Sequence, residues 1–407
     1  MVKYPHINRS TLSGLAATLV GNGIGRFAFI AIFPVLVSQA WFSYSQVSYL
    51  GAFTLLGYLL GIPLNNYFSK RVSTTTLLRL SMLLCSISYF ACSWQSAGFY
   101  WFVFWRTVVG ICGAILMVVA PHIVLSRCEA SERTRFSGVI FSGIGIGVMA
   151  SGTIVPFMLH VGLKATWITL GIICLLLTYF TWNEWSVSLP KHNNAAASPA
   201  ITNDNHPFAR KLSIICLLVA YALNAVAYLP HTLFWVVYIN QELHMSMAAA
   251  GFFWAIFGIG AAMGPFITST LSSYFDLSKA LLFSFILKSF GVLLPLLGHS
   301  IPALFFSSLL VGMFTPGIAN LVSSYSMKLS GITHYKRTWG WMTFSFAFTQ
   351  ALFGYAMVYM MSIQKSYQIL FAISFISLII SSACIVMLML CEQKQAFYKL
   401  AVNSNIS

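Results

Sequence analysis

The stretch Gly21-Asn22-Gly23-Ile24-Gly25-Arg26-Phe27 lies in the middle of an apolar run from about Thr11 to Val37. A run of that length can cross a bilayer, for which about 20 residues suffice. An arginine at its centre costs about 2.5–3.5 kcal/mol unless the side chain faces a protein interior or water. The glycines allow neighbouring helices to approach closely and the helix to bend. The stretch therefore predicts a first membrane helix that carries a buried positive charge and borders a central cavity.

The composition excludes a soluble protein, because 58% of the 407 residues are hydrophobic and only 7% are charged. Soluble domains carry about 25% charged residues. We therefore expect an all-α polytopic membrane protein with short loops. The net charge of +15 could also indicate nucleic-acid binding. The basic residues are spread over alternate loops, however, whereas a nucleic-acid site gathers them on one face.

Hydropathy predicts twelve membrane spans, six on each side of a polar break. The spans are expected at 11–38, 46–68, 77–95, 99–125, 136–160, 165–183, 211–240, 247–270, 278–298, 301–327, 338–362 and 367–390.

The basic residues of the loops predict the orientation of the chain in the membrane. The outer set of loops holds only Lys164 and Lys365, and three basic residues lie inside spans. Lysine and arginine accumulate in cytoplasmic loops, so both termini are expected in the cytoplasm. The inner set comprises Lys3, Arg9, Lys70, Arg71, Arg79, Arg127, Arg133, Arg135, Lys191, Arg210, Lys211, Lys279, Lys328, Lys336, Arg337, Lys394 and Lys399.

The long polar break divides the chain into two halves. Its core, 191–207, is rich in Asn, Ala, Ser and Pro, which cannot bury a hydrophobic core. We expect a six-helix half at 1–183, a cytoplasmic linker at 184–211, and a second half at 212–407 with a short cytoplasmic tail.

The two halves are weak repeats at an offset near 202 residues. Four matches at a common offset, all in equivalent positions, indicate an internal duplication. They pair Asn22 with Asn224, Gly25-Arg26-Phe27 with Ala227-Tyr228-Leu229, Arg106-x-x-x-Gly110 with Ser308-x-x-x-Gly312, and Arg135 with Arg337.

This organisation resembles the major facilitator superfamily. Arg106-Thr-Val-Val-Gly110-Ile-Cys-Gly113-Ala114 is similar to the Arg-x-x-x-Gly motif of the family's fourth helix. Gly23-Ile-Gly25-Arg26-Phe27 with Pro34, and the Gly-rich run Gly143-Ile-Gly145-Ile-Gly147, resemble the YbfB/YjiJ-type branch. The resemblance implies two pseudo-symmetric six-helix bundles in a bacterial inner membrane, working as a permease.

Two departures from the family pattern limit what the resemblance implies. Asn65 stands where the loop between the second and third helices usually has an acid, so the resemblance does not extend to the charge relay of that loop. The fifth helix lacks the Gly-Pro pair of drug antiporters, since Pro156 is separate from Gly147 and Gly152.

Polar residues inside the spans are the candidates for substrate binding. Arg26 could anchor an anionic group through its guanidinium, or be a structural charge that backbone carbonyls satisfy. The other candidates lie on helices that line the cavity in this fold, although each alone could be an interhelical hydrogen bond. They are Asn22, Asn224, Tyr228, Asn320 and Gln350.

A second group of residues is expected to act in coupling or gating. The family resemblance gives Arg106 and Gly110 that role, although a snorkelling arginine is the alternative. His231 could transfer protons or be a neutral core histidine, and Pro230 should kink its helix. Lys288 is expected to snorkel or to support the bundle, because its helix usually lies on the outside of this fold.

The carboxylates and cysteines narrow the chemistry. All seven carboxylates lie in loops or at helix ends, which makes a carboxylate proton relay improbable and leaves histidine, a substrate carboxylate or no coupling at all. The eight cysteines form no Cys-x-x-Cys pair, so we expect free thiols and no metal. No phosphate-binding loop is present, so neither a nucleotide cofactor nor ATP driving is expected.

The leading hypothesis is a monomeric secondary or facilitative transporter of a small anionic or zwitterionic solute. Its partners would be the solute, the lipid bilayer and, as an open question, a proton. Efflux of amphipathic or cationic compounds is the alternative within transport. A receptor or intramembrane enzyme is a remote alternative, because no His-Glu-x-x-His or Gly-x-Ser-x-Gly pattern is present.

Overall fold

The first span contains three successive helical segments. The structure is a computed structural model that describes residues 9–186, 207–364 and 366–404. An α-helix, α1 (Arg9–Thr18), runs into a π-helix, η1 (Leu19–Phe27), and then into α2 (Ala28–Ser38). The Gly-rich stretch is thus wound more loosely than an α-helix. Such π segments are frequent at functional sites.

The remaining chain is also helical, and no strand occurs among the described residues. In the first half, the helices are α3 (Tyr44–Phe68), α4 (Thr74–Ala91), α5 (Phe99–Leu125), α6 (Arg133–Leu159) and α7 (Leu163–Thr181). In the second half, they are α8 (Pro207–Ala227), η5 (Pro230–Phe234), α9 (Trp235–Val237), η6 (Tyr238–Glu242), α10 (Met247–Tyr274), α11 (Leu277–Leu297), α12 (Ile301–Gln364) and α13 (Tyr367–Ser404).

Eleven of the described helices are long and apolar enough to cross a membrane, rather than the expected twelve. The counts differ because α12, with 64 residues, contains both of the spans expected at 301–327 and 338–362, joined at a kink. Gly331, at φ 67° and ψ 168°, is the one non-helical residue inside α12. Helical geometry resumes directly after it, so the polar loop expected at 328–337 is reduced to a single turning point.

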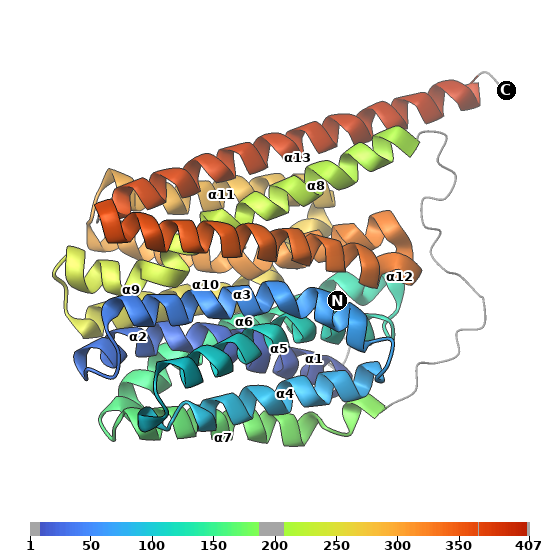
Figure 1. Cartoon of the computed structure of the whole chain (residues 1–407). Coiled ribbons are helices and arrows are strands. Elements are labelled where there is room, and N and C mark those ends of the chain that lie inside the picture. Colours follow the sequence, from blue (N-terminus) through green and yellow to red (C-terminus); the bar gives the residue numbers. More distant parts are fainter. Residues whose placement is uncertain (1–8, 187–206, 365, 405–407) are drawn as a thin grey trace, which may run out of the picture.

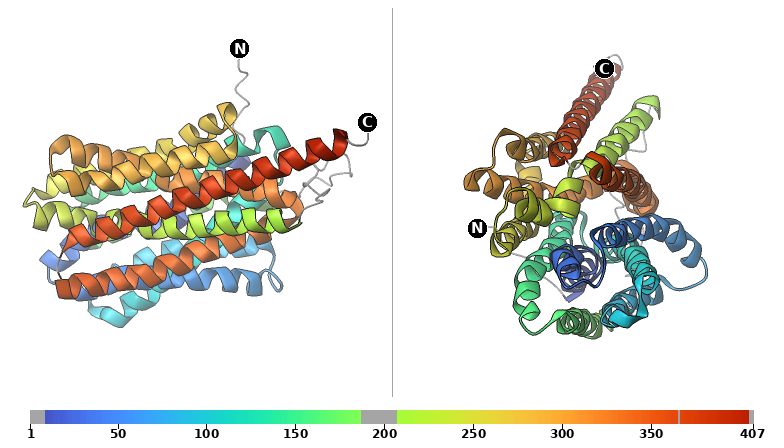
Figure 2. Two further views of the ribbon diagram at one scale, coloured as in Figure 1. Left: turned by 90° about the horizontal axis from the view of Figure 1, so that it is seen from above. Right: turned by 60° about the vertical axis from the view of Figure 1, so that its left-hand side comes forward.

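The helices lie side by side in two groups (Figure 1). The right-hand view of Figure 2 shows the helices of the first half, blue to green, on one side and those of the second half, yellow-green to red, on the other. The end of the bundle where α3 stops, α4 starts and α12 turns carries Lys70, Arg71, Arg79 and Lys336. We call it the basic end, and we call the other end the opposite end. The core of the expected linker, 187–206, lies outside the described residues.

Glycines bring two helix pairs into backbone contact, once in each half. In the first half, a Cβ added at Gly57, Gly61 or Gly110 would meet the carbonyl oxygen of Thr107, Ile111 or Thr54, respectively. In the second half, a Cβ at Gly260, Gly264 or Gly312 would meet that of Leu309, Met313 or Phe257. The positions on α5 and α12 differ by 202, and those on α3 and α10 differ by 203. The duplication predicted from sequence is therefore visible as the same close packing in both halves.

A second glycine pattern joins the two halves through α6 and α10. A Cβ at Gly138, Gly145 or Gly152 would contact Ser269, Ala262 or Ala255, respectively. Each step of seven residues along α6 matches a step of seven back along α10, so the two helices are antiparallel and in register. Gly143 and Gly147 face the first span instead, as expected for packing of small residues.

We predict that Gly264→Ala destabilises the protein, because the added methyl would lie against the backbone of Met313. Overpacking of this kind typically costs about 1–3 kcal/mol. The measurement is the thermal unfolding midpoint of the purified protein in detergent. Gly340→Ala is the matched control, since no atom lies within 4 Å of the position of its added Cβ. Equal midpoints for the two variants would contradict the close contact of α10 and α12.

Candidate functional site

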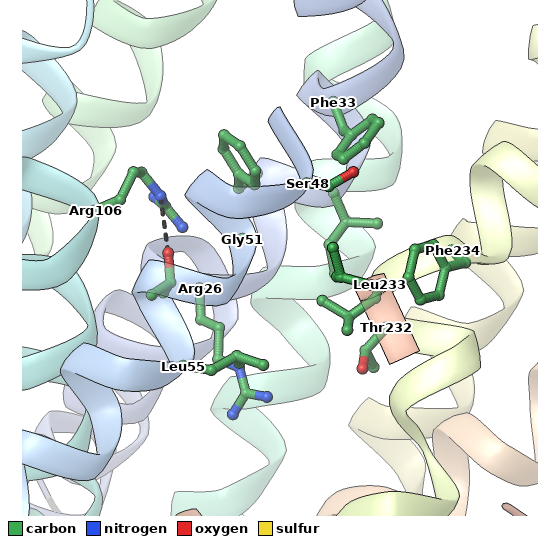
Figure 3. A pocket seen from close by; sticks show the side chains of 13 residues that line it. Arg26, Phe33, Ser48, Gly51, Leu55, Arg106, Thr232, Leu233 and Phe234 are labelled. Carbon is green, nitrogen blue, oxygen red and sulfur yellow. Dashed lines mark hydrogen bonds between the residues drawn. The ribbon is translucent and has the colours of Figure 1, made fainter. Parts of the chain in front are cut away.

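A cavity lies between the two halves and is lined mainly by apolar and aromatic side chains. It is narrow, with a free volume of about 30 Å³, and its walls come from α2, α3, α5, η5 and α12 as well as from the first π-helix. The polar members of the lining are Arg26, Ser48, Thr54, Arg106 and Thr232. Figure 3 shows the two arginines on one side and Thr232, Leu233 and Phe234 on the other. An apolar wall with a few polar groups is typical of small-molecule sites.

The cavity continues toward the opposite end of the bundle. Ser48, Phe234 and Val358 line both this cavity and a second one that reaches Ser45 and Glu242. Since α3 begins at Tyr44 and η6 ends at Glu242, the second cavity is a vestibule at the opposite end. A solute entering there would meet Ser48 before it reached the arginines.

Arg26 joins the first half to the second through uncharged groups. Its Nη2 donates to the hydroxyl of Tyr228 at 2.5 Å. The amide of Gln350, turned so that its oxygen faces the guanidinium, accepts from Nη1 at 3.2 Å and also from Nη2. The guanidinium carbon also lies 4.8, 5.4 and 5.6 Å from the ring centroids of Phe27, Tyr58 and Tyr228. Within the described residues, no carboxylate forms an ion pair with Arg26.

Tyr228 is the residue that the internal repeat pairs with Arg26, since the two positions differ by 202. The bond between them therefore joins equivalent positions of the two halves, as expected at a pseudo-symmetry axis. Gln350 reaches the same point from α12. The structure thus brings together three of the six substrate-binding candidates at the boundary of the halves.

Arg106 is buried and holds the π-helix of the first span. Its side chain is 1% exposed, so the snorkelling alternative is wrong. Nη1 donates to the carbonyl oxygen of Gly25 at 3.1 Å, and Nε donates to the hydroxyl of Thr54 at 3.2 Å. Tyr89 donates to the neighbouring carbonyl of Ile24 at 2.5 Å. Side chains from neighbouring helices thus satisfy carbonyl groups of the irregular segment, as a membrane interior requires.

Three other candidates lie in helix contacts. The amide of Asn22 donates to the carbonyl oxygen of Gly113 at 3.2 Å. The amide of Asn320 donates to Ser269 Oγ at 2.8 Å. Gly110 faces the backbone of α3. None of these residues lines the cavity.

Asn224 binds Lys288, which the sequence predicts either to snorkel or to support the bundle. Lys288 Nζ donates to Asn224 Oδ1 at 2.9 Å, and the lysine is 0% exposed. The expectation that Lys288 snorkels is therefore wrong, and the alternative that it supports the bundle fits its contact. Buried Ser284 and Ser289 beside it on α11 are the sequence signal that this helix turns a polar face inward.

His231 and Pro230 lie where the seventh span departs from α-helical geometry. Pro230 opens the π-helix η5, so the predicted local distortion is present. The His231 ring is fully buried, with Nε2 at 2.8 Å from Ser307 Oγ. It stacks on Trp235 with the ring centroids 4.3 Å apart.

Comparison with known proteins identifies the family. A family model described as "Uncharacterised MFS-type transporter YbfB" matches residues 18–388. Among solved structures, the chain is similar to a bacterial homologue of the iron transporter ferroportin in an outward-facing state. That likeness has a TM-score of 0.68 at 13% identity, covering 94% of this chain and 100% of that one, and it shows the fold alone. No curated protein matches the sequence.

We predict that Arg106→Met lowers the stability of the protein. The change leaves the Gly25 carbonyl without its arginine donor, and a buried unsatisfied polar group costs about 1–3 kcal/mol. The thermal unfolding midpoint should fall for Arg106→Met, and Arg106→Lys should recover only part of the loss. Arg71→Met is the control, because Arg71 is exposed. A wild-type midpoint for Arg106→Met would refute this role.

Proposed function

The chain belongs to the family of YbfB-type transporters of the major facilitator superfamily, and from this premise we propose that it carries a small anionic or zwitterionic organic solute. Transport would occur by alternating access, in which the two halves rock about the cavity between them. Membership of this family identifies the chain as an integral membrane transporter. The residues around Arg26 support an anionic or zwitterionic substrate.

The observation that carries this proposal is the set of partners of Arg26. A guanidinium binds a carboxylate through two parallel hydrogen bonds, which are stronger than those to neutral acceptors. Arg26 has only the Tyr228 hydroxyl and the Gln350 amide as side-chain acceptors in the described structure. A substrate carboxylate that reached the cavity could replace both of them. The partial burial of Arg26 favours such an exchange, because an anion compensates the guanidinium better than neutral dipoles do.

The same exchange connects binding to movement. Tyr228 and Gln350 belong to the second half, and Arg26 belongs to the first. A substrate that takes over the guanidinium therefore breaks a direct bond between the halves and can replace it with its own contacts. A ligand shifts a conformational equilibrium only through such differences in contacts between the two states. The cavity lies within one chain, so the proposed unit is a monomer.

We predict that Arg26→Gln abolishes counterflow of anions. The purified protein is reconstituted in liposomes and tested with lactate, gluconate, succinate and benzoate, and with tetraphenylphosphonium and ethidium as cations. Arg26→Lys should retain part of the exchange, because a lysine keeps the charge but loses the planar fork. Arg71→Gln is the control for removing an exposed arginine. Transport of the cations alone, unaffected by Arg26→Gln, would refute the proposal and favour efflux.

We also propose that the basic end faces the cytoplasm of a bacterial cell, since lysine and arginine accumulate on that side. A cysteine at exposed Ser45, at the opposite end, should then react with a membrane-impermeant maleimide in intact cells. A cysteine at exposed Ser273, at the basic end, should react only after the cells are opened. The wild-type protein gives the background from its own thiols. The reverse labelling pattern would show that the basic end faces outward and would contradict the proposed orientation.

A further inference from the structure

Lys288 is a basic residue in the interior of the second half with one hydrogen-bond acceptor in the described structure. It lies near the middle of α11, is 0% exposed, and donates to Asn224 Oδ1 at 2.9 Å. An ammonium group has three N–H donors. A buried lysine of this kind is held more easily as the neutral amine unless an anion accompanies it.

Among the described residues, the ionisable groups on the helices around Lys288 provide no such anion. Tyr228 faces it from the seventh span, and His231 is buried three residues further along that span. The helices α12 and α13 also pack on α11, and α13 carries Cys384. Lys328 of α12 and Glu392 of α13 pair with each other toward the basic end. On α11 itself, Lys279 pairs with Asp276 at the helix start. The hydroxyl of Tyr325 donates a hydrogen bond to Glu392. Tyr367 is the first residue of α13, and Tyr274 is the last residue of α10.

Lys288 and Arg26 flank the same aromatic ring. Lys288 Nζ lies 5.3 Å from the Tyr228 ring centroid, and the guanidinium carbon of Arg26 lies 5.6 Å from it. The two cationic centres are therefore at most about 11 Å apart, where each still acts on the other in an interior of low dielectric constant. Because arginine stays protonated in proteins, Arg26 opposes a second positive charge at Lys288 as long as the site holds no anion.

We propose that Lys288 carries the proton that is coupled to anion transport. An anion bound at Arg26 removes the opposing charge, and the lone pair of Lys288 Nζ then accepts a proton from water. When the anion leaves on the other side, Arg26 again opposes the charge, and the proton returns from Nζ to water there. One anion and one proton cross together. This inference rests on the proposed anion site. It assigns to Lys288 the coupling role that the sequence pattern suggests for His231.

The test measures proton uptake on binding by the full-length protein. The most active monocarboxylate of lactate, gluconate and benzoate is added to the protein in weakly buffered detergent with a pH-sensitive dye. The wild-type protein should take up about one proton per anion bound. Lys288→Met should take up none. In proteoliposomes, a gradient of one pH unit should make the wild-type protein accumulate the anion about tenfold. Lys288→Met should only equilibrate it while still exchanging it in counterflow.

The control variants separate coupling from stability. Lys279→Met removes an exposed lysine from the same helix and should keep the proton uptake. Lys288→Arg keeps a donor toward Asn224 but not a proton that can leave, so it should bind the anion without proton uptake. It serves in place of Lys288→Met if that variant does not fold.

Three results would overturn the inference. The first is wild-type exchange of the anion without proton uptake. The second is undiminished proton uptake by Lys288→Met or Lys288→Arg. The third is loss of uptake in His231→Gln but not in the lysine variants, which would move the role to His231. Wild-type protein that transports the cations but none of lactate, gluconate, succinate and benzoate would instead remove the proposed function, and this inference with it.

Discussion

Positive charge buried without acid partners is the constraint on which the interior of this protein depends. The basic side chains of Arg26, Arg106 and Lys288 lie inside the bundle, and each is held by neutral groups. Arg26 binds a hydroxyl and an amide, Arg106 binds a carbonyl and a hydroxyl, and Lys288 binds an amide. The neutral dipoles stabilise the guanidinium charges of Arg26 and Arg106 without cancelling them. An interior of this kind retains a positive potential, which is the basis of the proposed anion site.

The irregular backbone of the first span and the placement of the arginines are parts of one arrangement. The π-helix exposes carbonyl groups that an α-helix would use internally, and Arg106 and Tyr89 bind them from neighbouring helices. The glycines of the same segment allow α6 to approach closely, with Gly147 against Gly23. The segment that carries Arg26 is therefore fixed from two sides, while its guanidinium reaches across to the second half.

The two halves share the close packing of their helices but differ in their charged residues. The glycine contacts between α3 and α5 recur between α10 and α12 at matching positions. The charged groups do not recur, since Tyr228 stands opposite Arg26 and Ser308 takes the place of Arg106. Ser308 accepts from the Trp235 indole and has no cationic role. Close backbone contact tolerates only glycine at its positions, whereas the polar positions could change as long as each group kept a partner.

The sequence by itself determined the membrane class, most span limits, the duplication and the family, because hydropathy, loop charge and glycine spacing are local properties. It also singled out Arg26, Tyr228 and Gln350, which the structure brings together. Only the tertiary structure decided that Asn22 and Asn320 bind neighbouring helices, that Lys288 turns inward, and that α12 bends at one glycine. The reason is that a polar side chain in a span can satisfy its hydrogen bonds in several directions. The neighbouring helix that supplies the partner is fixed by packing, which no single segment of sequence encodes.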